Sequence, residues 1–357
     1  MKDIKFDLND IVIIPAEGSD VNSRTECNVF TEFNLDKFLP LMAAPMDTIV
    51  SPDNYKAFLD NNIIPCLPRG IDLNNIPFDK QYYFQAFGLN QIEEQLHYIF
   101  HEGDIDLRRG LDKFFWSYPN VLIDMANGHL SKLVEIVKDI KRKFPDVTLM
   151  VGNVANPETF ANLAMAGADY VRINIGAGAG CTTAANVSIN YPMGSLIEEC
   201  HQQRVRLGLW NTHIVADGGM KTYSDIIKAL ALGANYVMMG STFNKAIESA
   251  GFNYLYGIKI PLKTAEVLWK WGFFVKKKYR GMSTKEVQRS WGKSKLVTAE
   301  GITKYQKVEY TLEQWTENFS DYLRSAMSYC NAKELSDFIG NAQYVFITPN
   351  SYNRFNK

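Results

Sequence analysis

The stretch VLIDMANGHLSKLVEIVKDIKRKFPDVTLMVGNVANPETFANLAMAGADYVRINIG, residues 121–176, carries the clearest information on the fold. Three short apolar runs begin at Val121, Val147 and Ala168, and segments with helical spacing of apolar residues separate them. Strands that are apolar throughout and alternate with helices are typical of a parallel sheet covered on both faces. The stretch therefore predicts a repeating strand–helix architecture.

The same alternation continues toward residue 241. A helix is expected around SLIEECHQQ, a strand at HIVADGG, a helix at YSDIIKALALG and a strand at ANYVMMGS. Two helix starts have the expected local chemistry: Asn156 precedes Pro157, and Thr222 and Asp225 have capping-box spacing.

Two folds fit such a series, a doubly wound sheet and a closed (β/α)8 TIM barrel. Polar residues follow several strands: Asp124, Asn153, the loop of Cys181, Asp217 and Ser241. In a barrel the active site gathers at the C-terminal ends of many strands. The GxGxxG fingerprint of a dinucleotide-binding sheet is not met. We therefore predict the TIM barrel.

The flanking regions are less regular. FLPLMAAPMDT and NNIIPCLPRG predict early barrel strands, whereas residues 71–120 allow no assignment. Residues 270–310 are polar, lysine-rich and weakly periodic, which predicts a long loop. Long loops in compact domains are usually lids or disordered segments.

The composition excludes several classes of protein and of binding partner. Hydrophobic residues make up 46% of the 357 residues, charged residues 22%, and the formal net charge is -1, as in a globular protein. No basic excess suggests nucleic acid as a partner.

The start, MKDIKFDLNDIVIIP, predicts neither a signal peptide nor a membrane span, so we expect a cytoplasmic protein. The five scattered cysteines indicate neither a disulfide framework nor a CxxC metal site.

Cys181 lies in GAGAGCTT, directly after a glycine-rich run. A free cysteine is usually a small buried hydrophobe. Here the glycines leave room for a ligand, and nearby backbone N–H groups can favour a thiolate, so we favour a nucleophile. Thr182 and Thr183 could be helix-capping residues or could transfer protons beside the thiol.

ADGG (residues 216–219) and MMGS (residues 238–241) end two successive strands. Barrels often bind phosphate with the loops after strands 7 and 8, where glycines expose N–H groups. Asp217 at this place can accept from ribose hydroxyls. The two motifs together predict a site for a nucleotide monophosphate.

The ordered motifs PMDT, DMANG, GNV, GAGAGCTT, ADGG, MMGS and KKYRGMS resemble the IMP dehydrogenase and GMP reductase family over nearly the whole chain. The resemblance implies a (β/α)8 barrel, usually a homotetramer. It also implies that a cysteine attacks C2 of a purine nucleotide monophosphate and that a nicotinamide cofactor exchanges hydride with that carbon.

Roles implied by the resemblance fall into four groups. The catalytic pair would be Cys181 and Thr183. The nucleotide would contact Asp217, Gly218, Gly219, Gly240, Ser241, Tyr279, Gly281 and Met282. The cofactor side would include Asp124, Asn127 and Gly176. Backbone carbonyls of Gly176, Gly178 and Cys181 would hold a monovalent cation such as K+.

Within the family the sequence favours a GMP reductase that uses NADPH. Residues 71–120 are too short for the CBS insertion usual in IMP dehydrogenases, and CTT with YP downstream resembles reductases. The dehydrogenase lid carries an Arg-Tyr pair; here the lid has Arg289, Ser290 and Trp291. In reductases a glutamate directly follows a GMSS-like stretch. Here Lys285 holds that place and Glu286 comes one position later, so Glu286 is the predicted third catalytic residue.

Three alternatives stay open. They are an IMP dehydrogenase that uses NAD, a purine-nucleotide sensor without turnover, suggested by Ala179 and Lys285, and, more distantly, a flavin-dependent barrel oxidoreductase, which would have no use for Cys181. The predicted organisation is one barrel domain over residues 1–357, with a lid at about 276–300 and a C-terminal segment at about 311–357. Neither nucleic acid nor a membrane is an expected partner.

Overall fold

The structure is a computed structural model that describes residues 4–71, 80–101, 118–290, 298 and 300–355. Eight parallel strands close into a barrel, in which β11 pairs with β4. In chain order the strands are β4 (Leu41–Ala43), β5 (Ile64–Leu67), β6 (Phe84–Phe87), β7 (Asn120–Asp124), β8 (Thr148–Val154), β9 (Tyr170–Ile173), β10 (His213–Asp217) and β11 (Tyr236–Met239). The predicted TIM barrel is confirmed.

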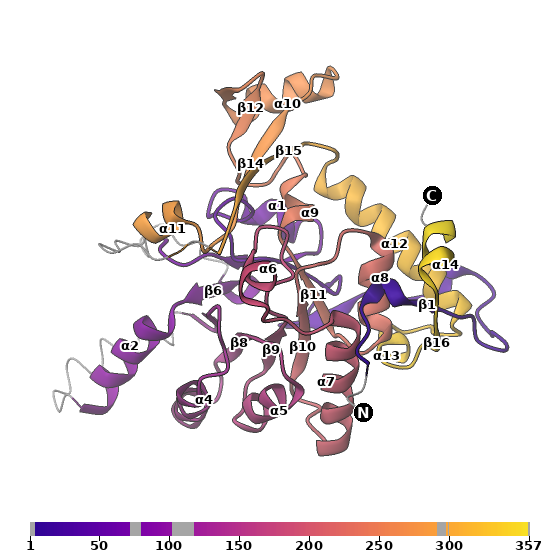
Figure 1. Ribbon diagram of the computed structural model, residues 1–357, viewed down its shortest axis with the longest axis horizontal. Coiled ribbons are helices and arrows are strands. Elements are labelled where there is room, and N and C mark those ends of the chain that lie inside the picture. The colour runs from indigo at the N-terminus through magenta and orange to yellow at the C-terminus, as the bar shows by residue number, and fades with distance from the viewer. Residues whose placement is uncertain (1–3, 72–79, 102–117, 291–297, 299, 356–357) are drawn as a thin grey trace.

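Helices connect the strands and surround the barrel (Figure 1). They are α1 (Tyr55–Leu59), α2 (Leu89–His101), α4 (Ser131–Lys143), α5 (Pro157–Met165), α7 (Met193–Leu207) and α8 (Tyr223–Ala231). Both predicted caps are confirmed: Asn156 accepts from the Thr159 amide at 3.0 Å, and Thr222 and Asp225 form a reciprocal capping box. Residues 71–120, for which the sequence allowed no assignment, supply β6 and α2.

Alternate strand residues point into the barrel or toward the helices. Leu122 and Met150 belong to the barrel's inner cluster, whereas Val121 and Leu149 pack on the outer one. Aromatic rings fill one end of the interior, where Phe33 contacts both Phe84 and Tyr170. Each fully buried side chain of this size contributes roughly 1.5–3 kcal/mol, so the barrel is a packed core that fixes the directions of the strand ends.

An antiparallel sheet projects from the barrel in Figure 1. Its strands, in spatial order, are β13 (Ile258–Ile260), β12 (Asn253–Leu255), β14 (Lys276–Arg280) and β15 (Thr303–Lys307), with α10 (Leu262–Lys270) beside them and α11 (Lys285–Ser290) after β14. The prediction of a long loop over residues 270–310 was therefore wrong at β14 and β15. In β14 the buried positions are Lys277 and Tyr279, and a buried lysine hides the alternation that identifies a strand.

The remaining elements are not strands of the barrel. The two ends of the chain meet where β1 (Ile11–Ile13) pairs antiparallel with β16 (Tyr344–Phe346). In the described ranges the other elements are 3-10 helices at Leu8–Asp10, Arg24–Glu26 and Lys80–Tyr82, a hairpin of β2 (Thr31–Phe33) and β3 (Asp36–Phe38), α6 (Thr183–Val187), α9 (Ser241–Asn244), α12 (Leu312–Tyr329), α13 (Leu335–Phe338) and α14 (Pro349–Phe355). None of the helices in the described ranges combines the length and the apolar character that a membrane span requires.

Candidate active site at the mouth of the barrel

A buried charge network joins the C-terminal ends of the strands. Arg172 on β9 donates to Asp124 at 2.8 Å and to Asp217 at 2.7 Å, and Arg69 pairs with Asp124 at 3.0 Å. The Arg172 side chain is only 6% exposed. Burial opposes its charge, but the attraction to Asp217 and Asp124 outweighs burial and raises the pKa of the guanidinium above its usual value. Arg172 therefore fixes both predicted ligand-binding carboxylates in one geometry.

Two asparagines also donate to Asp217, one to its carboxylate and one to its backbone carbonyl. Asn153 Nδ2 donates to Asp217 Oδ2 at 2.7 Å and to the Asn174 carbonyl at 3.0 Å. Asn174 Nδ2 donates to the Asp217 carbonyl at 2.9 Å. Among the described residues no group donates to Asp217 Oδ1, so this oxygen is available to a hydroxyl of a ligand. The sequence placed Asp124, Asn153 and Asp217 at one end of the barrel, and the structure brings them together.

The Cys181 thiol begins a chain of hydrogen bonds. Cys181 Sγ donates to Thr183 Oγ1 at 3.1 Å, and Thr183 Oγ1 in turn donates to the Glu300 carboxylate. The backbone holds the three residues in register, because the Thr182 amide donates to the Glu300 carbonyl at 2.8 Å and Cys181 forms a β-bridge with Gly301. The arrangement can move a proton from the thiol through the hydroxyl to a carboxylate.

Glu300 is a residue that the sequence analysis missed. The predicted acid, Glu286, has a half-exposed carboxylate that pairs with Lys278 at 2.9 Å and with Arg280 at 2.6 Å. The hydrogen bond from Lys278 and the nearby Arg280 charge lower the pKa of Glu286. Glu300 stands 117 positions after Thr183 in the chain, so only the pairing of its segment with the Cys181 loop could reveal it.

The predicted nucleotide-binding glycines line one side of the thiol loop. Gly218 and Gly219 follow β10 with φ angles of +76° and +83°, and a Cβ on Gly218 would lie 3.3 Å from Gly178 Cα. A Cβ on Gly281 would lie 2.5 Å from the Gly180 carbonyl oxygen, and one on Gly240 would lie 3.5 Å from Tyr279 Oη. At Gly218 and Gly281 backbone therefore approaches backbone closely, which favours glycine, whereas the contact of Gly240 with Tyr279 is an ordinary van der Waals contact with a side chain. Ser241 directly follows Gly240, and Met282 follows Gly281.

The residues predicted for the cofactor and the cation lie around the same mouth. Asn127 is in the loop after Asp124, and its side chain accepts from the His129 amide at 3.0 Å. Gly176 has a φ of +87°, and the Gly178 carbonyl accepts from the Cys181 amide at 2.8 Å. Carbonyl oxygens are suitable ligands for a hard cation. No cluster of three or more His, Cys, Asp or Glu residues suited to a metal occurs within the described ranges.

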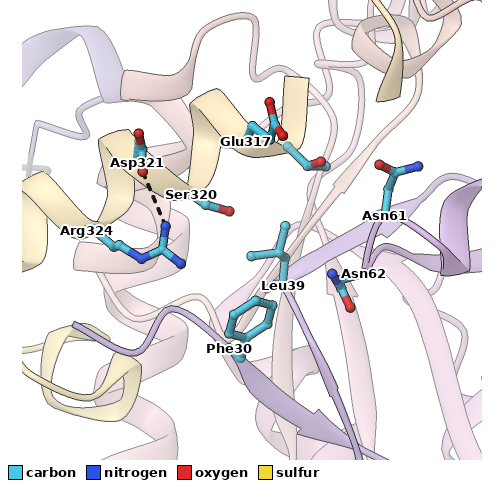
Figure 2. A pocket seen from close by; sticks show the side chains of 9 residues that line it. Phe30, Leu39, Asn61, Asn62, Glu317, Ser320, Asp321 and Arg324 are labelled. Carbon is cyan, nitrogen blue, oxygen red and sulfur yellow. Dashed lines mark hydrogen bonds and ion pairs between the residues drawn. The ribbon is translucent and has the colours of Figure 1, made fainter. Parts of the chain in front are cut away.

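A separate pocket of about 360 Å³ lies on another part of the molecule (Figure 2). Its lining includes Leu39, Asn61 and Asn62, which precede β4 and β5, and polar side chains of α12. It therefore opens at the N-terminal ends of the strands, and none of the mouth residues above lines it.

Comparison with known families identifies the family of the chain. A model of the IMP dehydrogenase / GMP reductase domain matches residues 118–354, which run from β7 to α14 and include Asp124, Cys181, Asp217 and Glu300. The chain belongs to this family. The family's two named activities are those of oxidoreductases that act on purine nucleoside monophosphates.

The similar proteins divide between the two activities. The chain is 34% identical to an inosine-5'-monophosphate dehydrogenase of Chlorobaculum parvum, over 64% of this chain and 45% of that protein. It therefore matches less than half the length of that relative. It is 28% identical to a GMP reductase of Staphylococcus epidermidis over 98% of both chains, and 26% identical to human GMP reductase 2 over 97% of this chain and 95% of that protein.

Proposed function

We propose that the protein is a GMP reductase, which converts GMP to IMP and ammonia at the expense of NADPH. The observation on which this rests is the hydrogen-bonded series Cys181–Thr183–Glu300 at the barrel mouth. Alignment with GMP reductases over nearly their whole length supports it. In this proposal Glu300 takes the acid–base position that was predicted for Glu286, because Glu300 is the carboxylate in contact with Thr183.

The nucleotide would lie across the mouth with its purine C2 against Cys181. Asp217 Oδ1 would accept from the ribose hydroxyls. The glycine turns at Gly218, Gly219 and Gly240, with Ser241 and Tyr279, would surround the phosphate. Gly281 and Met282 would contact the base. Arg172 and Asn153 occupy the other carboxylate oxygen of Asp217, so the ribose-binding oxygen is already oriented before ligand arrives.

The first half of the reaction needs only this chain and GMP. The thiol proton passes through Thr183 to Glu300 as sulfur bonds to C2, and Glu300 then returns a proton to the amino group. The C2–N2 bond breaks and ammonia leaves, with the purine joined to Cys181. Two successive steps thereby replace one difficult displacement.

The second half needs a hydride donor. The orphaned amide oxygen of Asn174, buried at the mouth, is an acceptor suited to a group with N–H donors. Asp124 ends β7, Asn127 lies in the loop after it, and Gly176 lies in the loop after β9. These residues would hold the nicotinamide cofactor, which supplies hydride to C2 when bound. On this hydride supply the C2–S bond would break with the electron pair going to sulfur, and IMP would leave. We also propose a K+ ion on carbonyls of Gly176, Gly178 and Cys181, and a homotetramer.

IMP dehydrogenase is the second candidate, since the 34% identity to such an enzyme exceeds the identities to the reductases over its shorter alignment. Two assays of nicotinamide absorbance separate the candidates. With GMP and NADPH, the reductase lowers the absorbance near 340 nm. With IMP and NAD, a dehydrogenase raises it. No change in either assay would reject both activities and favour a nucleotide-binding protein without turnover.

A further inference from the structure

Asn174 follows β9 and has an unusual backbone conformation. Its φ is +109°, a value that glycine adopts freely and that strains the backbone of any other residue. Three hydrogen bonds hold it: its amide donates to the Val154 carbonyl at 2.7 Å, its carbonyl accepts from Asn153 at 3.0 Å, and its Nδ2 donates to the Asp217 carbonyl at 2.9 Å. The chain retains a strained asparagine at the junction of β8, β9 and β10.

The side-chain amide of Asn174 has a defined orientation. A backbone carbonyl can only accept, so the nitrogen of the amide must face Asp217 and the oxygen must face away. The residue is 2% exposed, and Oδ1 has no hydrogen-bond partner among the described residues. A buried acceptor without a donor destabilises a folded protein. The described residues offer Oδ1 no donor, so a ligand that donates a hydrogen bond to it would remove this cost.

The surroundings of this oxygen indicate which ligand could donate a hydrogen bond to it. Asn174 is bonded to Asp217 and Asn153, and Arg172 connects Asp217 to Asp124, the residue on the proposed cofactor side. The glycine-rich loop and the Asn174 amide lie near the same turn, because Ala177 Cβ and Asn174 Nδ2 lie 3.3 and 3.9 Å from the position of a Cβ on Gly219. Because Asn174 is 2% exposed, a ligand reaches Oδ1 only when residues around it move.

The chemistry of the proposed function selects the donor. Hydride transfer brings the nicotinamide ring to within about 3.5 Å of the purine carbon attached to Cys181. The carboxamide of that ring is attached next to the reacting carbon and presents two N–H donors. We propose that Asn174 Oδ1 accepts one of these N–H groups and thereby selects and orients the nicotinamide. This inference rests on the proposed reductase or dehydrogenase function of the same site.

The test compares two cofactors that differ only at this donor. In the 3-acetylpyridine analogue of NADP+, a methyl group replaces the amide nitrogen, while the carbonyl oxygen stays. Kd values for both are measured by calorimetry in the presence of IMP, without turnover. We expect the wild-type protein to bind NADP+ about fivefold more tightly than the analogue, the size of one hydrogen bond. In Asn174→Gly this ratio should fall to about one.

Glycine is the suitable replacement because it adopts a φ of +109° without strain, so the variant keeps its fold. Asn211→Ala, which changes an exposed residue in the turn before β10, is the matched control and should keep the fivefold ratio. An unchanged ratio in Asn174→Gly would overturn the inference, as would a loss of IMP affinity with the cofactor ratio intact. If the wild-type protein binds neither cofactor, the proposed function itself fails.

Discussion

At the scale of single residues, the site contains two kinds of group. Some are charged groups already held by their partners, and one is a thiol that can react. Arg172 neutralises two carboxylates that could not otherwise stay buried together. The Cys181 thiol donates to the Thr183 hydroxyl, and that hydroxyl donates to the Glu300 carboxylate. The fixed charges orient the ligands, and the hydrogen-bonded series performs the proton transfer.

Cys181→Ala should abolish turnover of GMP, by at least about a thousandfold, because no covalent intermediate can form. The affinity for the nucleotide should stay within about tenfold, since the thiol acts in bond making more than in binding. Steady-state oxidation of NADPH and calorimetric titration with GMP measure the two quantities. Turnover near the wild-type rate would exclude the covalent mechanism.

Glu300→Gln should lower kcat on the order of a hundredfold or more, because an amide cannot take the proton from Thr183. Glu286→Gln should have a much smaller effect, since the Glu286 carboxylate is already paired with Lys278 and Arg280. The two variants are compared by kcat with GMP and NADPH at saturation. The assignment from sequence alone predicts the opposite order, and that result would return the acid–base role to Glu286.

At the scale of elements, β14 couples the projecting sheet to the nucleotide side of the barrel. Lys277 is fully buried, and its ammonium group donates to the Ser249 carbonyl and, at 3.4 Å, to the Gly251 carbonyl. The next buried residue of the strand is Tyr279, beside Gly240. The lysine therefore anchors the strand that brings Tyr279 and Gly281 to the mouth.

Burial lowers the pKa of Lys277 to about 7, although Glu248 and Glu266 oppose this shift. The unfolded chain, with a lysine pKa near 10.4, binds a proton between about pH 7 and 10 that the folded protein lacks. Folding stability should therefore rise with pH across this window, by up to about 1.4 kcal/mol per pH unit. Lys277→Met lacks this dependence, so it should be more stable than wild type near pH 6.5 and lose that advantage by about pH 9.5.

Urea unfolding at the two pH values measures the difference, and Lys276→Met, which changes an exposed neighbour in the same strand, is the control. An equal effect of Lys277→Met at both pH values would show that the buried amine does not titrate in this range.

At the scale of the whole molecule, large apolar side chains are exposed on the projecting sheet and its helix. Tyr256, Trp271 and Phe274 are 81%, 74% and 64% exposed. Lysines lie among them, with Lys307 over the Phe274 ring at 4.8 Å. Large exposed apolar side chains gathered on one projecting part are common at protein contact surfaces, so this part is a candidate for subunit contact.

We expect a homotetramer in solution. Light scattering coupled to gel filtration should give a mass of four chains of 40.5 kDa each, and Trp271→Ser with Phe274→Ser should lower that mass if the projecting sheet contributes to assembly. A mass of one chain for the unmodified protein would contradict the tetramer.

The barrel and most of its mouth could be predicted from local patterns in the chain. Hydrophobic periodicity depends on near neighbours, so the strands from β7 to β11 and their helices were predictable, and parallel strands necessarily present Asp124, Cys181 and Asp217 at one end. The partners of these residues depended on contacts between distant segments. Glu300 stands 117 positions after Thr183 and is held beside it by an isolated β-bridge between Cys181 and Gly301. Arg172 is, in the sequence, one polar residue in an apolar strand. The β14 strand was missed because burial of Lys277 depends on carbonyls from a distant loop, which no local pattern records.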